Sequence, residues 1–437
     1  MKTYFALLVM LIVTAVLIMS GCNKSDNPTG PTTNDPQKAA ERVNQANQIM
    51  IPRIASIYAT QGSDTSQFNM SGAISLYREA LTYDSTNTNA HLGLALTEFV
   101  HLASDHDFWA LFQEGAGLMP GVTKGTVLLS PEYAMGVKEQ IHKTALPFSK
   151  GGNPLVPYSS YLKDFMKITG LHHPPSFYQN LVELRILPVL SDVIVHLNFL
   201  TRHPNFAFYI TPSMVSGQLP DSVRIDLMEV YILLVAVQGL ASECSFAVSY
   251  NIDYADTNAS EVAQAWQVTS SFLQLRANGL QRMRDTKTYI LGMATSVQNG
   301  INFLINQTPH PGIQLIQYRP ADLPKLNQIK YGMDSIKQAF TTTIQEQGVS
   351  VNMGSFFDNP IGNFKAKIPS YTVDGTVQQP DGKYNVVLRW QALSYATWVF
   401  PDPTFNGVFP GMTDPELKLH MELTADQWEP TIVIGGD

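Results

Sequence analysis

Cysteine and charged side chains are both scarce in this chain. Its 437 residues include only two cysteines, Cys22 and Cys244, and Asp, Glu, Lys and Arg together make up 15% of the chain. Two cysteines exclude a disulfide framework, and they exclude a zinc site built on cysteine ligands. A folded domain of this chain must therefore be stabilised by packing, and hydrophobic residues, at 44%, are frequent enough to form a core.

Basic residues are also few, and no run of Lys or Arg occurs. Lys and Arg number 28 against 36 Asp and Glu, so the formal net charge is −8. Proteins that bind nucleic acid need a basic face to neutralise phosphates. The composition therefore argues against a nucleic-acid partner.

Recognisable catalytic and cofactor motifs are missing as well. The sequence contains no serine in a Gly-x-Ser-x-Gly frame and no glycine-rich phosphate-binding loop that ends in Gly-Lys-Ser/Thr. We accordingly expect no catalytic residues, no cofactor and no enzymatic activity. A pair of catalytic carboxylates stays open, because glycosidase acids lie far apart in sequence.

Metal-capable side chains gather in three places, and none has the spacing of a metal motif. A helical zinc site wants two histidines four residues apart with a glutamate between them, and a calcium loop wants alternating acids and a glycine. We therefore interpret these residues as polar groups at helix ends and in loops, and we predict no metal. They are His101, Asp105, His106 and Asp107, the pair His172 and His173, and Asp253, Asp256 and Asn258.

The N-terminus carries a targeting signal. Lys2 precedes an apolar stretch from Phe5 to Met19, which ends in Met19-Ser20-Gly21-Cys22. The stretch is shorter than the ~20 residues of a membrane-spanning helix, so a secretory signal is the better interpretation than a membrane helix. Met19 to Cys22 resembles the lipobox of bacterial lipoproteins. The resemblance implies that residues 1–21 are removed and that Cys22 is acylated.

Residues 22–38 are predicted to be the lipidated cysteine and a flexible tether. Asn, Thr, Pro, Gly and Ser dominate the stretch, which has too few apolar residues to offset the entropy of ordering. The membrane is thus an expected partner through the N-terminal lipid. Asn23, rather than an aspartate, follows the cysteine, and this favours the outer membrane as the location within the bacterial cell envelope.

Helical periodicity dominates residues 39–348, which we predict to be one helical domain. Apolar residues recur at steps of three and four, as on the buried face of a helix. A helix opened by Asp221 is apolar nearly all round and is expected at the centre of the domain. The other predicted helices cover 39–58, 71–82, 89–103, 130–146, 177–202 with a kink at Pro188, a long stretch from Asn258 that is weakened at Gly279 and resumes over 290–304, and 322–340.

One helix pair resembles a tetratricopeptide repeat. Ala73, Tyr77 and Ala80 fill the small-aromatic-small positions of the second helix, and Leu94 with Ala95 opens the next unit. The resemblance covers residues 68–103 and implies stacked helices with a concave binding surface. An ordinary antiparallel helix pair is the alternative.

Residues 349–437 have a different composition, and we predict a C-terminal extension on the helical domain. Tyr371 to Val373 and Val386 to Leu388 flank the turn signal Pro380-Asp381-Gly382, which indicates a β-hairpin. The rest, Ala392 to Gly436, reads as an irregular, aromatic-rich wrap. Its aromatic side chains either pack on the helices or bind a ligand, and the ligand-binding candidates are Trp390, Trp398, Phe405 and Phe409.

Together these features predict a mainly α protein with a tetratricopeptide-like helical bundle and a small C-terminal β-hairpin. The expected function is that of a membrane-anchored envelope lipoprotein, a non-catalytic binding or scaffolding module for a protein partner or a transport system. The alternatives are a lipoprotein that binds a glycan or a hydrophobic ligand for nutrient uptake, and a hydrolase.

Overall fold

The structure is a computed structural model of the whole chain. It describes residues 35–59, 65–105, 107, 175–211, 222–253, 271–307, 313–314, 316, 318–346, 348–367, 371–378, 384–390, 400–417 and 432–436. Several predictions concern residues outside these ranges and stay predictions. They include the signal and tether with Cys22 up to residue 34, the helix over 130–146, the first part of the helix from Asn258, the turn Pro380-Asp381-Gly382, and Trp398.

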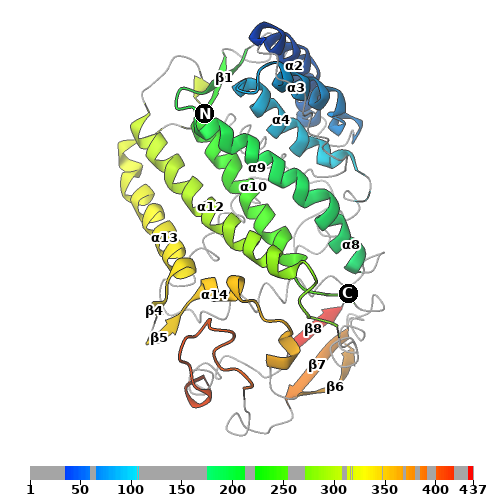
Figure 1. Cartoon of the computed structure of the whole chain (residues 1–437), viewed down its shortest axis with the longest axis vertical. Coiled ribbons are helices and arrows are strands. Elements are labelled where there is room, and N and C mark those ends of the chain that lie inside the picture. The colour runs from blue at the N-terminus through cyan, green and yellow to red at the C-terminus, as the bar shows by residue number, and fades with distance from the viewer. Residues whose placement is uncertain are drawn as a thin grey trace. The chain divides into compact units, whose positions relative to one another are not determined.

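Helices make up most of the described chain, as predicted (Figure 1). The α-helices are α2 (Pro36–Ala59), α3 (Ser71–Tyr83), α4 (Thr88–His101), α8 (Pro175–Leu181), α9 (Leu187–Thr201), α10 (Leu227–Ala247), α12 (Gly279–Asn306), α13 (Leu323–Thr341) and α14 (Met353–Asp358). Short 3-10 turns cover Thr65–Phe68, Leu102–Ser104, Pro320–Asp322 and Phe364–Lys367.

Three small sheets accompany the helices. Strand β1 (Ala207–Ile210) pairs antiparallel with β2 (Val223–Asp226), which pairs parallel with β3 (Ile313–Gln314). Strands β4 (Ile344–Glu346) and β5 (Val349–Val351) form a hairpin. The third sheet has the order β6 (Tyr371–Gln378), β7 (Tyr384–Trp390), β8 (Ile432–Gly436), and all its pairs are antiparallel.

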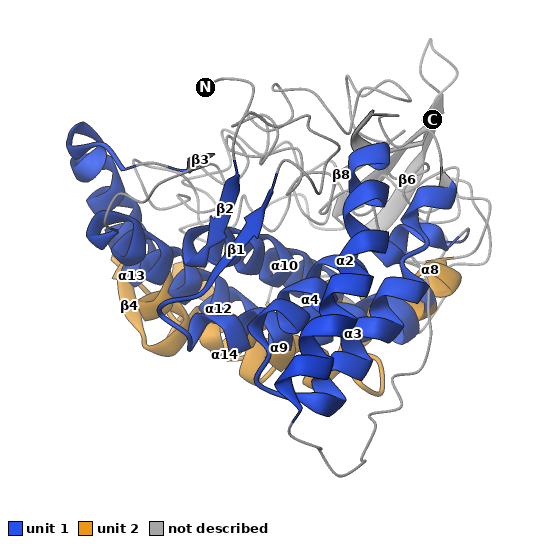
Figure 2. Cartoon of the chain, turned by 90° about the horizontal axis from the view of Figure 1, so that it is seen from above, with its two compact units in different colours: residues 1–138, 181–244, 289–334 blue, residues 139–180, 245–288, 335–437 orange. Residues whose placement is uncertain are grey.

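The chain divides into two compact units, each built from separated segments (Figure 2). Unit 1 consists of residues 1–138, 181–244 and 289–334, and unit 2 consists of 139–180, 245–288 and 335–437. Unit 2 includes residues on both sides of the predicted domain boundary at 348/349. The boundary itself stays a prediction.

The core of unit 1 comes from α2, α3, α4, α9 and α10. Leu94, Leu190, Leu197 and Leu234 are at most 1% exposed and belong to one continuous hydrophobic cluster. By length and composition alone, Pro175–Thr201 and Leu227–Ala247 are apolar enough to cross a bilayer, but a core helix of a soluble protein passes the same test.

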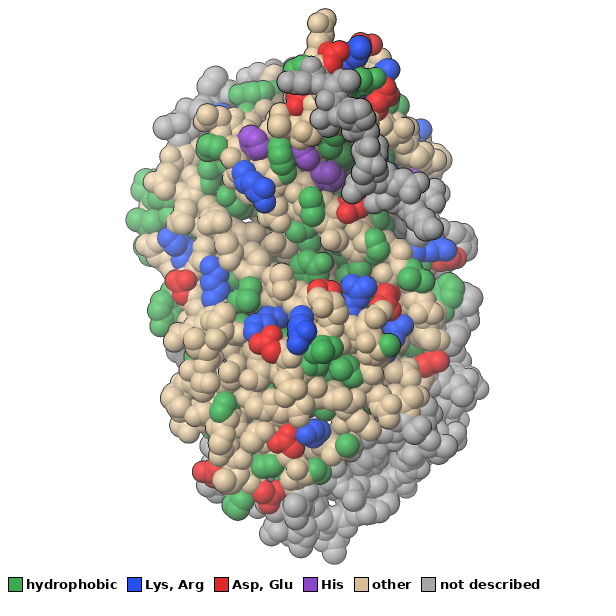
Figure 3. Space-filling view, viewed as in Figure 1, with side chains coloured by type: hydrophobic (Ala, Val, Ile, Leu, Met, Phe, Trp, Pro, Cys, Tyr) green, Lys and Arg blue, Asp and Glu red, His purple; other side chains and the backbone are tan. Residues whose placement is uncertain are grey.

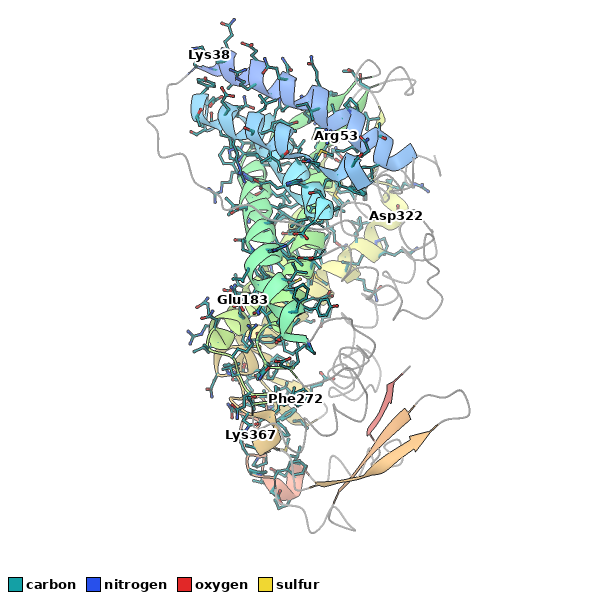
Figure 4. The ribbon with its side chains drawn as sticks, turned by 90° about the vertical axis from the view of Figure 1, so that its right-hand side faces the viewer. Lys38, Arg53, Glu183, Phe272, Asp322 and Lys367 are labelled. Atoms are coloured by element: carbon teal, nitrogen blue, oxygen red, sulfur yellow. The ribbon has the colours of Figure 1, made fainter. Side chains whose placement is uncertain are left out.

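Several predicted elements are confirmed. Helix α2 includes Pro52, α3 and α4 match the predicted helix pair, and α13 follows Asp322 as expected. The predicted β-hairpin is formed by β6 and β7. Figure 4 labels Lys38 and Arg53 on α2, and Asp322 just before α13.

The predicted kink at Pro188 takes the form of a π-helical turn, Val182–Ile186, between α8 and α9. Proline has no N–H, and its ring collides with the carbonyl of the residue four positions earlier in a regular helix. Widening the preceding turn removes that collision, and such single π turns are a recurrent way to do so. The chain therefore continues as helix on both sides.

The predicted start of the apolar helix at Asp221 is wrong. Residues 223–226 form strand β2, and α10 begins at Leu227. Asp226 caps the helix, because its Oδ1 accepts from Met228 N at 2.9 Å, while Glu229 Oε2 accepts from Asp226 N at 2.8 Å. This reciprocal pair is a capping box, and it fixes the helix start at Leu227 instead of Asp221.

The prediction of a helix running through Phe272 and Leu273 up to Gly279 is wrong too. Residues 271–278 are turns and short bridges, and Leu273 has a φ of 59°, which no α-helix accommodates. Gly279 begins α12 instead of weakening a helix. A Cβ at Gly279 would lie 2.4 Å from the Ser249 carbonyl oxygen, so this close approach requires glycine.

The C-terminal wrap is not wholly irregular. Residues 432–436 form β8 on the outer edge of β7, within the stretch predicted to be irregular. Strands β1 to β5 and the short helix α14 were likewise not predicted. Strands of two to four residues carry too little alternation to be recognised in a sequence.

Candidate functional site: a polar cluster between helices α3, α4 and α9

A tightly packed tyrosine holds α3 against α2 and α4. Tyr77 is fully buried, and its hydroxyl donates to Asn47 Oδ1 of α2 at 2.5 Å. Gly93 of α4 lies against the ring, so close that an added Cβ would be 2.2 Å from Tyr77 Cζ. Small residues on α3, Ala73 and Ala80, are also fully buried. This close packing fixes the positions of the polar side chains on α3 and α4.

Arg78 of α3 pairs with a buried carboxylate on α4. Its Nη2 lies 2.9 Å from Oε1 of Glu98, which is 7% exposed. Among the described residues, the other oxygen of Glu98, Oε2, has no hydrogen-bond partner. Burial raises the pKa of Glu98 to about 7, and the nearby Asp192 of α9 adds to the rise while Arg78 opposes it. Burial also raises the pKa of Asp192.

Two histidines meet directly where α4 contacts α9. His91 Nδ1 and His196 Nδ1 are 2.8 Å apart. His91 Nε2 lies 3.1 Å from the Ser85 carbonyl oxygen, which can only accept, so Nε2 of His91 carries a proton. In the neutral state Nδ1 of His91 is therefore the acceptor, and His196 donates its Nδ1–H. Burial lowers the pKa of both rings, that of His196 to about 4.

Aromatic stacking surrounds the histidine pair. The His91 ring stacks on Phe199 with centroids 3.8 Å apart, and Phe199 contacts His203 at 4.6 Å. His203 donates from Nδ1 to the Phe199 carbonyl at 3.0 Å. In the space-filling view, histidine side chains gather over the region of α4 and α9 (Figure 3). His91 is buried and His196 is half-buried, so the pair is not fully open to water.

Chemically, this cluster is suited to holding and exchanging protons. It combines one permanent cation, Arg78, with two carboxyl groups and two imidazoles whose pKa values are all displaced by burial. In the described part of the chain, no group of three or more His, Cys, Asp or Glu side chains is arranged to hold a metal ion.

A second buried polar group lies at the β2–α10 junction of unit 1. Arg224 Nε is 3.4 Å from Oδ2 of Asp226, and Gln307 donates to the same oxygen. Burial raises the pKa of Glu229 to about 8, with Asp226 contributing. Since Asp226 and Glu229 form the capping box of α10, this group has a structural role.

Three of the metal-capable residues weighed in the sequence have other partners, whereas Asp253 Oδ1 is buried and has no hydrogen-bond partner among the described residues. His101 Nδ1 accepts from the Met70 amide at 3.2 Å. Asp105 pairs with Arg185 of the π-helical turn at 2.6 Å, and Asp107 lies 3.4 Å from the same guanidinium. His106, His172, His173, Asp256 and Asn258 lie outside the described residues.

Of the aromatic ligand-binding candidates, the structure brings Phe405 and Phe409 together. Their rings meet edge to face at 6.1 Å, and Phe400 contacts Phe405 at 6.3 Å. Phe409 is only 6% exposed, so it packs within unit 2 rather than presenting a platform. Trp390 is the last residue of β7, and nothing further is described of its side chain. Their role in ligand binding stays a prediction.

The loop that carries Phe405 is held by Asp402. Its Oδ1 accepts from Thr404 N at 3.0 Å, and its Oδ2 accepts from Asn406 N at 2.8 Å and from Lys367 Nζ at 2.7 Å (Lys367 is labelled in Figure 4). Burial alone would raise the pKa of Asp402, but the hydrogen bonds from Lys367, Thr404 and Asn406 hold it well below its usual range. These contacts make Asp402 the structural anchor of the loop.

The histidine and carboxylate cluster had no recognisable signal in the sequence. His91 and His196 are 105 residues apart, and Glu98 sits in an otherwise apolar helix. A single buried polar residue in an apolar helix is the only hint that sequence offers. Comparison with protein-family models, with curated proteins and with solved structures finds no match for this chain.

Proposed function

We propose that this protein is a lipid-anchored lipoprotein of the bacterial cell envelope whose helical part is a non-catalytic binding or scaffolding module. The lipobox-like Met19-Ser20-Gly21-Cys22 and the polar stretch after it support the anchor. The observation that carries the binding role is the helix layer of α2, α3 and α4, which follow one another in the chain and pack through Tyr77, Gly93 and small residues.

This packing is what a tetratricopeptide-like arrangement requires. Such helices lie side by side, need small or aromatic residues at their contacts, and leave one face of each outer helix free for a partner. In α2 the free face is polar and exposed, with Asn44 and Gln48 on it. We expect this face to contact a protein partner or a component of a transport system.

The anchor is tested by replacing Cys22 with serine. Wild-type protein is expected in the membrane fraction, labelled by an alkynyl palmitate analogue, and processed at residue 22. Cys22→Ser is expected to lose the label and to accumulate unprocessed. Cys244→Ser is the matched control, since burial raises the pKa of this thiol to about 12 and makes it a poor nucleophile. Unchanged processing and labelling of Cys22→Ser would disprove the anchor.

The binding role is tested by photocrosslinking in cells. A photoreactive amino acid at Asn44 or Gln48 of α2 is expected to give the same discrete protein adduct. The control position is Gln328, which is exposed on α13. Adducts of equal yield from all three positions would speak against a specific face on α2.

The ligand-binding alternatives are tested with the purified protein. Affinity electrophoresis with soluble polysaccharides reports glycan binding, and native mass spectrometry of the purified protein reports a retained lipid or metabolite. If a glycan or hydrophobic ligand is bound and no protein adduct forms, the result would favour a role in nutrient uptake over a scaffolding role.

A further inference from the structure

We propose that the junction of α4 and α9 is an acid-sensitive joint, in which uptake of a second proton by the His91–His196 pair separates the two helices. This inference concerns regulation and does not depend on the lipid anchor. It rests on the geometry of the two rings and on the side chains that surround them.

The geometry leaves room for only one proton between the rings. Nδ1 of His91 and Nδ1 of His196 are 2.8 Å apart, a normal distance for one hydrogen bond. His91 Nε2 already donates to the Ser85 carbonyl. When both imidazoles are protonated, each nitrogen of the 2.8 Å contact carries a hydrogen and a share of positive charge, so the contact becomes repulsive.

The rings have little freedom to turn away from each other. His91 is 8% exposed and its ring lies flat on Phe199, with an angle of 21° between the planes. Rotating His91 would break both the stacking on Phe199 and the hydrogen bond to Ser85. His91 is therefore held in place, and the repulsion acts on His196 and on the helix α9 that carries it.

The surrounding charges mostly oppose protonation of the pair. The positive charge of Arg78 on α3 disfavours protonation of His196. His203, which follows α9, disfavours protonation of His91. Asp84, which follows α3, favours protonation of His91. Arg78 also interacts with Glu98 of α4 and Asp192 of α9. Because the pKa of His196 falls to about 4 in the folded protein, the unfolded chain binds protons more readily. Stability contributed by the pair is thus present above about pH 6.5 and is lost as the pH falls toward 4.

Glu98 works in the opposite direction. Its pKa is raised to about 7 in the folded protein, so its protonation favours the folded state as the pH falls from that value. The two effects offset one another in the wild-type chain. A Glu98→Gln background removes the carboxyl contribution and leaves that of the histidines.

The test compares Glu98→Gln with Glu98→Gln/His196→Asn. Asparagine places an amide N–H close to the position of Nδ1, so it keeps the donor to His91 but takes up no proton. Hydrogen exchange of α9 amides, corrected for intrinsic rates, is measured at about pH 7 and about pH 4.5, the range in which the pair is expected to titrate. We expect protection to fall at least ~10-fold in Glu98→Gln and less than ~2-fold in the double variant.

Glu98→Gln/His203→Asn is the matched control, because His203 contacts Phe199 but its hydrogen bond goes to its own helix end. It should still lose protection at low pH, because the contact between His91 and His196 is kept. An equal loss of protection in Glu98→Gln and in Glu98→Gln/His196→Asn would disprove the acid-sensitive joint.

A second measurement uses the wild-type protein, so the proposal can be tested even if a variant does not fold. NMR titration of the imidazole carbons of His91 and His196 should show that burial lowers the pKa of both rings, that of His196 to about 4. It should also show chemical exchange of α9 residues with the same midpoint. Ordinary titration of both rings at ~6.5 would mean that they do not form the closed pair.

Discussion

At the scale of single residues, α3 and α4 pack closely around Tyr77. Tyr77 is fully buried, hydrogen-bonded to Asn47, and covered by the backbone of Gly93. The resemblance to a tetratricopeptide repeat rested partly on Tyr77, and the structure shows why an aromatic residue fits there. A ring of that size fills the space between three helices only if one neighbour has no side chain.

Gly93→Ala is therefore expected to destabilise the protein although alanine is the better helix former. The new Cβ would be 2.2 Å from Tyr77 Cζ, and the ring is enclosed on all sides. Overpacking of this kind costs ~1–3 kcal/mol, measured as the loss of unfolding free energy in urea.

Gly332→Ala in α13 is the matched control. Nothing lies within 4 Å of its Cβ position, so the change is expected to stabilise the helix by ~0.5–1 kcal/mol. If both alanine variants gain stability, the contact between Gly93 and Tyr77 is looser than described.

At the scale of elements, side chains at the helix ends decide where helices begin. Asn87 caps α4 by accepting from Ala90 N at 3.0 Å, and Asp226 with Glu229 caps α10. The signal for the second cap was present in the sequence as Asp226-Leu227-Met228-Glu229, but the apolar residues before it were read as helix. Val223 and Ile225 are apolar because β2 is buried between its two neighbours, and periodicity over four residues does not separate this from a helix.

Asn87→Ala is expected to destabilise the protein by ~1 kcal/mol, because one N–H at the start of α4 loses its acceptor. The loss is measured as a lower urea midpoint with an unchanged m-value. Asn87→Asp should keep wild-type stability, since a carboxylate also accepts and is favoured at a helix N-terminus. Equal losses in both variants would show that packing of Asn87, and not the cap, matters.

At the scale of the whole molecule, buried carboxyl groups influence how stability depends on pH. Glu98 has a pKa of about 7 in the folded protein against 4.5 for the ordinary side chain. A group with a raised pKa stabilises the folded state at low pH, and that contribution is lost as the pH rises through about 7. The wild-type protein therefore carries a penalty above neutral pH that comes from burying the ionised carboxylate.

Glu98→Gln should remove this penalty. The quantity to compare is the unfolding free energy of the variant minus that of the wild type, measured in urea. This difference is expected to be larger at about pH 8 than at about pH 5, by on the order of 2 kcal/mol. Glu79→Gln is the control, since Glu79 is 38% exposed and pairs with Arg42 near the surface. A parallel pH dependence of the wild type and Glu98→Gln would contradict a raised pKa.

Sequence alone predicted the helical class, most helix positions in the described chain and the hairpin of β6 and β7. These depend on interactions between residues close in the chain, namely helical periodicity and turn chemistry. The polar cluster was not predicted, because nothing local relates His91 to His196 or Arg78 to Glu98. Likewise β8 forms only because β7 offers it an unpaired edge.

The chain by itself thus determined that most of its described part is helical, since helical periodicity is set by neighbouring residues. Only the tertiary structure decided which polar side chains are enclosed together. Packing of α3, α4 and α9 encloses Glu98, His91 and His196, and the removal of water from these side chains displaces their pKa values.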